Sequence, residues 1–332
     1  MKYYLKKTLT LYRQDNKICV GQVNDLDNYL ELDYNSFNLQ KIENIIINGI
    51  SKEEDDLYFD LFYSKGFLEK NRSLTEKRNN LFIEYVSNKK INESLFKKKI
   101  LVFGAGGGGG TIVYMLAQFG FTNISVIDFD YVEFSDVDKT MVYDKSMIGR
   151  FKVDALKEKI LLNFSIEIST FNNEIINKKE LDNFIELIKP QFIVKAADPK
   201  GIFLKNLNII CFEKKIPFIQ MAYSYESLKI GPILVPEITS CNEFINQENI
   251  KFYGEHYQIE KFERIFNNNF IHPSVSFNIN ILSSLILKEI VFFLLEKYEF
   301  CQTIGRMIIL NTLNFDKQTY LFNCNESCNV CK

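Results

Sequence analysis

Three glycines in the middle of the chain have the spacing of a phosphate-binding turn. Gly104, Gly106 and Gly109 lie in "ILVFGAGGGGGTIVYMLAQFG", between an apolar run and an amphipathic run. Glycine lets the main chain turn tightly and lets backbone amides approach a phosphate at a helix N-terminus. Asp128 follows the next apolar run, about 20 residues further on, where a carboxylate can accept hydrogen bonds from a ribose. The pattern favours a nucleotide site over a glycine-rich spacer, but it does not distinguish NAD(P), FAD and ATP.

The composition narrows the class of protein. The chain has 332 residues, of which 46% are hydrophobic and 25% charged, as is usual for globular domains. A net charge of -2 argues against a nucleic-acid-binding protein, which would normally carry a basic stripe. We find no run of about 18 uninterrupted apolar residues and no signal peptide at the N-terminus. The sequence therefore predicts a cytoplasmic protein whose partners include neither nucleic acid nor a membrane.

The residue patterns divide the chain into three segments. Residues 1–66 contain strand-like runs ("TLTLYRQ", "KICVGQV", "YLELD") followed by two helical patterns, which predicts a small winged-helix-like α+β domain. Residues 67–97 are polar and helical in pattern, and we interpret them as a connector. From residue 98 onward, buried strands such as "KILVFG", "NISVIDFD" and "QFIVKAAD" alternate with helices. This alternation predicts an α/β fold, a doubly wound Rossmann-like sheet.

Helix boundaries in the first segment follow from capping residues. Asn35 or Ser36 would cap the first helix. Ser51 would cap the second, with acidic residues in its first turn, and Gly66 would end it.

The residues that follow the glycine run point to one family. "GAGGGG", "DFDYVEFSDVDKT", "IGRFKVDALKEKI", "AADPKG" and "PFIQMAYSYESLKIGPILVP" occur in that order. Their order and separation resemble the ubiquitin-activating superfamily in its bacterial forms, ThiF, MoeB and MccB, from about Arg78 to the C-terminus. The resemblance implies an ATP-dependent adenylyltransferase that acts as a homodimer. In that reaction a carboxylate attacks the α-phosphate of ATP and displaces pyrophosphate, and no general base is needed because the nucleophile is already ionised.

The resemblance also implies roles for individual residues. Lys152 and Lys139 would neutralise phosphate charge, Asp198 would hold Mg²⁺, and Arg78 would reach the triphosphate, often across a dimer interface. The nucleotide would lie against Gly104, Gly106, Gly107, Gly109, Asp128, Asp130, Asp136 and Lys152.

Each catalytic assignment has a structural alternative. Lys152 could be a solvated helix lysine, Asp198 could cap a turn before Pro199, and Arg78 could be a surface arginine of a polar helix.

Three positions depart from the family pattern. Asp136, Lys139 and Thr140 stand where that pattern has Asn, Arg and Gln. Lysine keeps the positive charge of arginine but lacks the planar fork that grips phosphate. Asp136 places a negative charge near the nucleotide, and we expect it to face Mg²⁺ or the ribose.

The cysteines raise the question of a metal. Of seven cysteines, three lie in the last nine residues. The resemblance implies a structural Zn²⁺ bound by two CxxC pairs, although Phe244 occupies one cysteine position. The ligands would be Cys241, Cys324, Cys328 and Cys331. The alternative is a metal-free tail with free cysteines. Cys211, within "IICFEKK", is predicted to be a buried helix residue.

The first segment indicates what is activated. Its order of three strands and two helices resembles the PqqD-like recognition elements of peptide-modifying enzymes, which MccB-type enzymes also carry. Such elements bind a leader peptide by adding it as a strand to a sheet edge. The candidate edge is "NYLELDY", with the helix from Ser36 forming the other wall of the groove. The alternative is a plain structural cap on the larger domain.

The resemblance therefore implies adenylation of a carboxylate, at the C-terminus or on a side chain, of a short ribosomally made precursor peptide with a leader segment, as in microcin C-type antibiotic synthesis. Three alternatives stay open. They are an adenylyltransferase for a ubiquitin-like sulfur carrier, a non-catalytic leader-binding scaffold, and an NAD-dependent oxidoreductase.

Overall fold

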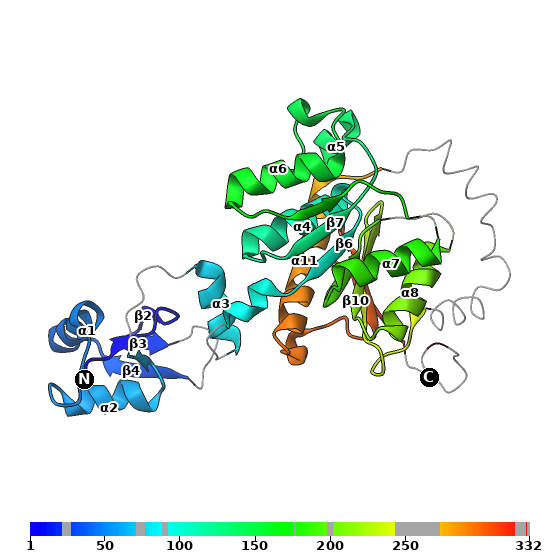
Figure 1. Ribbon diagram of the computed structural model, residues 1–332. Helices are drawn as coiled ribbons and strands as arrows, with labels where there is room; N and C mark the ends of the chain where they lie inside the picture. Colours follow the sequence, from blue (N-terminus) through cyan, green and yellow to red (C-terminus); the bar gives the residue numbers. More distant parts are fainter. Residues whose placement is uncertain are drawn as a thin grey trace. The chain divides into compact units, whose positions relative to one another are not determined.

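The computed structural model describes residues 1–21, 28–70, 77–87, 92–175, 177–197, 202–242, 273–322 and 330 (Figure 1). Cys324, Cys328, Cys331 and Asp198 lie outside these ranges. The chain divides into two compact units, Met1–Asn92 and Glu93–Lys332.

The first unit combines a small sheet with helices. A three-stranded antiparallel sheet has the order β2-β3-β4, and a separate two-stranded sheet pairs β1 with β5. The elements are β1 (Tyr4–Leu5), β2 (Thr10–Gln14), β3 (Lys17–Gly21), β4 (Tyr29–Asp33), α1 (Ser36–Asn48), α2 (Asp56–Ser64), β5 (Leu68–Glu69) and α3 (Arg78–Ser87).

Side chains set the helix boundaries of this unit. Asn35 caps α1, because its Oδ1 accepts a hydrogen bond from the backbone N–H of Asn38 at 2.8 Å. The prediction that Ser51 caps the second helix is wrong, because Asp55 holds that place and accepts from Tyr58 N at 3.2 Å. Ser51 lies in a preceding turn, in which its N–H donates to the Glu54 carboxylate at 3.1 Å. Apolar side chains of the sheet and of both helices then form one core.

The second unit contains one sheet of eight strands, in the order β13-β12-β11-β10-β9-β6-β7-β8. The strands from β8 to β10 in that order are parallel, and β10 to β13 continue as antiparallel neighbours. The elements are η1 (Glu93–Lys97), β6 (Ile100–Phe103), α4 (Gly107–Phe119), β7 (Ile124–Ile127), α5 (Phe134–Lys139), η2 (Lys145–Met147), α6 (Lys152–Phe164), β8 (Ser169–Phe171), α7 (Lys178–Ile188), β9 (Phe192–Lys195), α8 (Phe203–Glu213), β10 (Phe218–Ser224), β11 (Ser227–Leu234), α11 (Ser276–Leu294), η4 (Tyr298–Phe300), β12 (Arg306–Asn311) and β13 (Lys317–Leu321).

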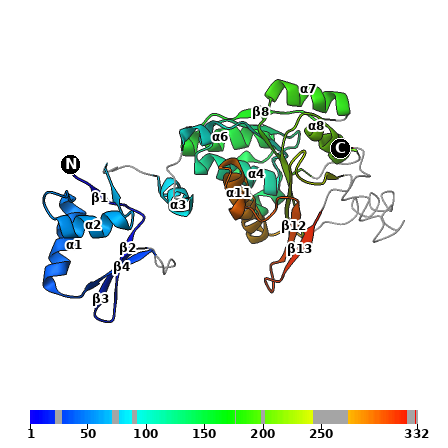
Figure 2. The same cartoon turned by 90° about the horizontal axis from the view of Figure 1, so that it is seen from below.

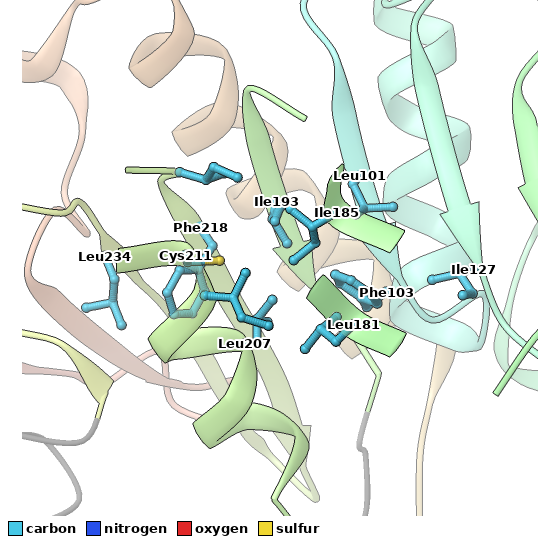
Figure 3. Close-up of a cluster of buried hydrophobic side chains, with 12 residues drawn as sticks. Leu101, Phe103, Ile127, Leu181, Ile185, Ile193, Leu207, Cys211, Phe218 and Leu234 are labelled. Carbon is cyan, nitrogen blue, oxygen red and sulfur yellow. The ribbon is translucent and has the colours of Figure 1, made fainter. Parts of the chain in front are cut away.

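Helices cover both faces of this sheet. Figure 2 shows α7 and α8 on one side, with α4, α6 and α11 on the other. Leu101, Phe103 and Ile193 point from the sheet toward α7 and α8, where they meet Leu207 and the buried Cys211 (Figure 3). The α/β, doubly wound fold predicted from the sequence is therefore confirmed, and Cys211 is a buried helix residue as expected.

The sequence patterns missed some elements of this unit. Helix α4 begins within the glycine run, at Gly107, so four of the five consecutive glycines belong to it. The hairpin β12–β13 and the short helix α5 were not predicted. Strand β12 reads RMIILN, with four consecutive apolar residues instead of an apolar–polar alternation, so it gives no period-two signal.

Helix α11 is long and apolar enough to cross a membrane by length and composition, but half of the tested window is buried within the unit. It contacts α4, β10 and β11, as a core helix does.

The buried carboxylate of Glu289 links α11 to the segment that precedes β12. Glu289 is 3% exposed, and its Oε2 accepts from Gln302 N at 2.9 Å, Thr303 N at 3.0 Å and Thr303 Oγ1 at 2.7 Å. Lys288 Nζ lies 2.8 Å from Oε1. One side chain thus satisfies three donors just before β12.

We expect Glu289→Ala to lower the free energy of unfolding of the second unit by about 3–5 kcal/mol, because the buried donors and the cation lose their acceptor. Urea denaturation followed by circular dichroism measures the change. The matched control is Glu213→Ala, which removes an exposed carboxylate paired with Lys178 and should cost less than about 1 kcal/mol. Equal effects of the two substitutions would contradict the anchoring role.

Candidate nucleotide-binding site

The glycine turn connects β6 to α4, and its three spaced glycines meet different surroundings. Gly104 has φ +100°, and a Cβ there would lie 2.7 Å from Ala197 N at the end of β9. A Cβ on Gly109 would lie 2.0 Å from the carbonyl oxygen of Gly104. Gly106, the N-cap of α4, has no neighbouring atom within 4 Å of such a position. The three glycines therefore match the division of roles in a dinucleotide-type turn, namely tight turn, open approach and helix–strand packing.

The other glycines of the run are packed against the protein. A Cβ on Gly107 would lie 2.8 Å from Ile279 Cδ1 of α11, and one on Gly108 would lie 3.0 Å from Met221 Cε of β10. Gly110 faces the carbonyl oxygen of Ala105. Because these positions meet protein atoms, the length of the glycine run reflects close packing of α4 as well as the open position at Gly106.

Asp128 follows β7, and its carboxylate contacts the backbone of the glycine turn. Its Oδ2 accepts from Ala105 N at 2.6 Å, and its Oδ1 accepts from Asp130 N at 2.8 Å. The carboxylate is partly exposed. Since an ionised carboxylate has about four acceptor positions, Asp128 keeps acceptor capacity for a ribose hydroxyl.

Tyr143 also contacts the glycine turn. The sequence patterns did not indicate this residue. The side chain is 3% exposed, and its hydroxyl donates to the carbonyl oxygen of Ala105 at 2.5 Å. Burial raises the pKa of Tyr143 well above its usual value, and the nearby carboxylates of Asp128 and Asp136 raise it further. The phenol is therefore a neutral hydrogen-bond donor. No local spacing signals this role, because donor and acceptor are 38 residues apart.

Asp136 is a buried carboxylate between two lysines. Only 2% of its side chain is exposed, and its Oδ2 accepts from Glu133 N at 3.0 Å in a capping box at the start of α5. Lys139 Nζ lies 3.0 Å from Oδ1, and Lys152 Nζ lies 3.5 Å from Oδ2. The structure thus gives this charge two ammonium partners, where the sequence suggested Mg²⁺ or ribose.

The charges of this cluster stabilise one another. Burial alone would raise the pKa of Asp136, but the Glu133 N–H and the ammonium groups of Lys152 and Lys139 outweigh it and lower that pKa. Burial alone would lower the pKa of Lys152, but Asp136, Asp130 and Asp128 outweigh it and raise that pKa. Asp136 is therefore ionised and Lys152 protonated at neutral pH.

Lys152 begins α6 and is held in place by its backbone. Its N–H donates to Asp130 O at 2.9 Å, and Tyr131 stacks on Phe151 with 4.3 Å between ring centroids. The ammonium group lies 3.4 Å from Asp130 Oδ2, and 11% of the side chain is exposed. Lys152 is therefore not a solvated helix lysine.

Thr140 has a structural use. It is buried, and its Oγ1 accepts from Val142 N at 3.1 Å and Tyr143 N at 3.3 Å. This turn places Tyr143 under the glycine turn.

The remaining predicted site residues lie in the other unit or outside the described part of the chain. Arg78 is an exposed residue at the start of α3, in the first unit. Asp198 lies outside the described residues, although its neighbour Ala197 contacts Gly104.

The predicted zinc ligands fall largely outside the described residues, as Cys324, Cys328 and Cys331 do. Cys241 is buried and packs with Phe212 and with Val330, which lies between two of the tail cysteines in sequence. Among the described residues, no group of three His, Cys, Asp or Glu side chains could hold a metal ion.

Fold and site together define a Rossmann-like α/β protein with a dinucleotide-type glycine turn. The model of the ThiF family matches residues 78–330, and the chain therefore belongs to the ThiF family. This confirms the family suggested by the sequence motifs.

Curated relatives match part of this region. The chain is 29% identical over 126 residues to the adenylyltransferase and sulfurtransferase MOCS3 of Culex quinquefasciatus, covering 38% of this chain and 28% of that protein. It is 27% identical over 131 residues to the molybdopterin-synthase adenylyltransferase of Escherichia coli, covering 39% and 51%. The chain thus spans about half or less of the length of these relatives.

Solved structures match the whole chain. The microcin C7 biosynthetic enzyme MccB, in complex with N-formylated MccA, superposes with a TM-score of 0.75 at 20% identity, covering 100% of both chains. MccB of E. coli with ATP gives a TM-score of 0.72 at 19% identity, again over 100% of both chains. PaaA gives 0.73 at 19% identity, covering 96% of this chain and 100% of the other. At these identities the similarity establishes the fold.

We expect Gly109→Ala to lower the free energy of unfolding by about 3 kcal/mol, because its Cβ would collide with the Gly104 carbonyl. Gly106→Ala is the matched control and should stay within about 1 kcal/mol of the wild type. Thermal denaturation of both variants tests this difference. A Gly109→Ala protein as stable as the wild type would contradict the packing role.

Asp136→Asn should reduce stability in a pH-dependent way. Because the folded-state pKa of Asp136 is lowered, the charged carboxylate stabilises the fold above the ordinary aspartate value of about 3.9 and ceases to do so as pH falls through the lowered pKa. Wild type should exceed Asp136→Asn by about 1–3 kcal/mol at pH 7, and the gap should shrink below about pH 4. Urea denaturation between these pH values measures it, with exposed Asp138→Asn as control. A gap that does not narrow in acid would refute the assignment.

Proposed function

We propose that the protein is an ATP-dependent adenylyltransferase that activates the C-terminal carboxylate of a ribosomally made precursor peptide, in peptide-antibiotic synthesis of the microcin C type. One observation supports this most strongly. The similarity to MccB extends over the whole chain, including the first unit, whereas the matches to MOCS3 and to the molybdopterin-synthase adenylyltransferase cover 38% and 39% of it.

The chemistry requires charge neutralisation rather than proton transfer. A carboxylate oxygen of the peptide attacks the α-phosphorus of ATP, and the bond from that phosphorus to the bridging oxygen breaks. The products are an acyl adenylate and pyrophosphate, with no proton moved because the carboxylate is ionised at neutral pH. The barrier lies in bringing an anion to the polyanionic triphosphate, so cations at the phosphates lower it.

The residues of the site suit these tasks. The open position at Gly106 admits a phosphate to the N-terminus of α4, and the unused acceptor positions of Asp128 suit a ribose. Lys152 and Lys139 bring ammonium groups, with Asp136 holding both. Arg78 would add a further cation at the triphosphate.

The proposed reaction also requires Mg²⁺. The side chains of Asp128, Asp130 and Asp136 outnumber those of Lys139 and Lys152 by one, so these five groups carry a net negative charge. A nucleoside triphosphate therefore requires Mg²⁺, which Asp198 would hold and which would supply charge neutralisation at the phosphates.

A structural Zn²⁺ would be held by the cysteine set predicted from the sequence. The packing of Val330 beside Cys241 supports the approach of the tail to that cysteine. A homodimer and a cytoplasmic location are further parts of the proposal.

The peptide would be recognised by the first unit, through addition of a leader strand to an open edge of the sheet. The edge predicted from the sequence is β4, with α1 as the neighbouring wall. This unit contains the order of strands and helices on which that prediction rests.

Two other functions have specific support. MOCS3 and the molybdopterin-synthase adenylyltransferase favour a ubiquitin-like sulfur carrier as the substrate. The Asp136 and Lys139 departures favour a leader-binding scaffold without catalysis.

Exchange of labelled pyrophosphate into ATP separates these functions. We expect exchange that depends on Mg²⁺ and on a short precursor peptide, to be sought in the neighbouring reading frames. Exchange only with a carrier protein ending in Gly-Gly would support the sulfur-carrier function, and no exchange with either substrate would support the scaffold.

Within the same assay, Lys152→Ala should reduce exchange at least about 100-fold, because a buried cation facing the phosphates is lost. Lys157→Ala is the control on the same helix, since that lysine pairs with Glu167 at the surface. It should retain near-normal exchange. If Lys152→Ala behaves like Lys157→Ala while both remain folded, Lys152 does not bind the phosphates.

A further inference from the structure

A cluster of side-chain amides lies beside the carboxyl end of β9, on the face of the sheet that α8 covers. Ile193 of β9 and Phe218 of β10 point toward α8 (Figure 3). Because side chains alternate along a strand, Lys195 and Gln220, two residues further on, are on the same face. These two residues are paired across the strands, and Lys195 is also paired with Phe103, the last residue of β6. The cluster is therefore at the edge of the sheet where the glycine turn begins.

Hydrogen bonds link the amides of this cluster. Gln220 Nε2 donates to Asn242 Oδ1 at 2.9 Å, and Asn242 N donates to Asn208 Oδ1 of α8 at 2.8 Å. Asn208 and Asn242 are buried, whereas Gln220 is half-buried. The amide cluster, which consists of these three residues, thus joins α8, β10 and the segment after β11, and it reaches the surface at Gln220.

One hydrogen-bond donor of the amide cluster is left over. Asn208 is 0% exposed, and its Nδ2 has no hydrogen-bond partner within the described part of the chain. The backbone N–H of Asn242 determines which end of the Asn208 amide faces it, since an N–H requires the carbonyl oxygen. The other end is consequently a donor, and a buried donor without a partner is unfavourable. A ligand that brings an oxygen acceptor to Asn208 Nδ2 would remove this cost.

The end of β9 separates the amide cluster from the glycine turn. Ala196 and Ala197 follow Lys195 and are half-buried. A Cβ on Gly104 would lie 2.7 Å from Ala197 N, so these alanines directly adjoin the turn. A substrate residue lying across the two alanines would have the glycine turn on one side and the amide cluster on the other. Its carboxylate would then face the phosphates while its side chain faced the amides.

We propose that the amide cluster is a specificity site, which binds a side-chain carbonyl oxygen on the substrate residue that carries the activated carboxylate. The oxygen belongs to a carboxylate or to a carboxamide. This inference rests on the proposed function, and it assigns recognition of that residue to Asn208, Gln220 and Asn242. An aliphatic side chain is rejected at this site, because it leaves the Asn208 donor buried and unpaired.

The test measures the binding of three probes to the full-length protein in the presence of Mg²⁺ and the ATP analogue AMPCPP. The probes are N-acetyl-glycyl-aspartate, N-acetyl-glycyl-asparagine and N-acetyl-glycyl-leucine, and saturation-transfer NMR gives their affinities. We expect the aspartate or the asparagine probe to bind at least about tenfold more tightly than the leucine probe. Whichever of the two binds more tightly identifies the oxygen as that of a carboxylate or of a carboxamide.

Asn208→Asp is the sharpest variant, because it keeps the oxygen that accepts from Asn242 N and replaces the donor with a second oxygen. At about pH 8 it should remove the tenfold preference and leave the affinity of the leucine probe within about twofold. Gln220→Met, at a half-buried position, should reduce the preference at least about threefold. The control is Lys205→Gln, which changes an exposed residue of the same helix and should leave all three affinities unchanged. Thermal denaturation of every variant confirms folding.

Two results would overturn the inference. The first is a wild type that binds the three probes equally or binds none of them. The second is an unchanged preference in folded Asn208→Asp and Gln220→Met proteins, which would mean that the amides only hold the segment after β11.

Pyrophosphate exchange separates failure of this inference from failure of the proposed function. An Asn208-dependent preference among the probes, in a protein that never exchanges pyrophosphate, would reject the enzyme and retain the amide cluster as a binding site. Normal peptide-dependent exchange in Gln220→Met, with an unchanged KM for the peptide and an unchanged preference among the probes, would reject the amide cluster alone.

Discussion

The close approach of α4 to the end of β6 is the constraint on which the site depends. Only a hydrogen atom fits between Gly109 and the carbonyl of Gly104, since a Cβ there would lie 2.0 Å from that oxygen. This contact fixes the first turn of the helix directly above the sheet and points its N-terminus at the open position over Gly106. Asp128 and Tyr143 then hold Ala105 through its N–H and its carbonyl. Contacts with three neighbouring groups thus hold the turn that leads into the N-terminus of α4.

The charged side chains beside the glycine turn are also held in place by the protein. Lys152 and Lys139 are long side chains that would lose conformational freedom when a phosphate binds. Contacts with Asp136 hold both ammonium groups in advance, and the backbone bond from Lys152 to Asp130 fixes the start of α6. The lowered pKa of Asp136 and the raised pKa of Lys152 both reflect the attraction between this carboxylate and this ammonium group. Pre-organisation and charge state thus have the same cause.

The sequence predicted those features that depend on neighbours along the chain. The strands before and after the glycine turn, and the alternation of strands with helices, follow from local patterns. The sequence could not predict which glycines are packed, because some of their neighbours come from distant elements, such as Ile279 of α11 beside Gly107 and Met221 of β10 beside Gly108. Tyr143 was missed because its acceptor, the carbonyl oxygen of Ala105, is 38 residues away. The Asp136–Lys139 pair was available from its i,i+3 spacing, but its burial was not.

The Asp136 and Lys139 departures are coupled by the structure. An asparagine at position 136 could accept the Glu133 N–H as well as aspartate does, but it would remove the carboxylate that pairs with Lys139 and one of the two that pair with Lys152. With aspartate there, one positive charge of the pair is already balanced when the nucleotide approaches. Less positive charge then remains for the triphosphate than in a site with asparagine and arginine. In the proposed reaction this chain consequently depends more heavily on Mg²⁺ and on a cation from outside the cluster, which is the part assigned to Arg78.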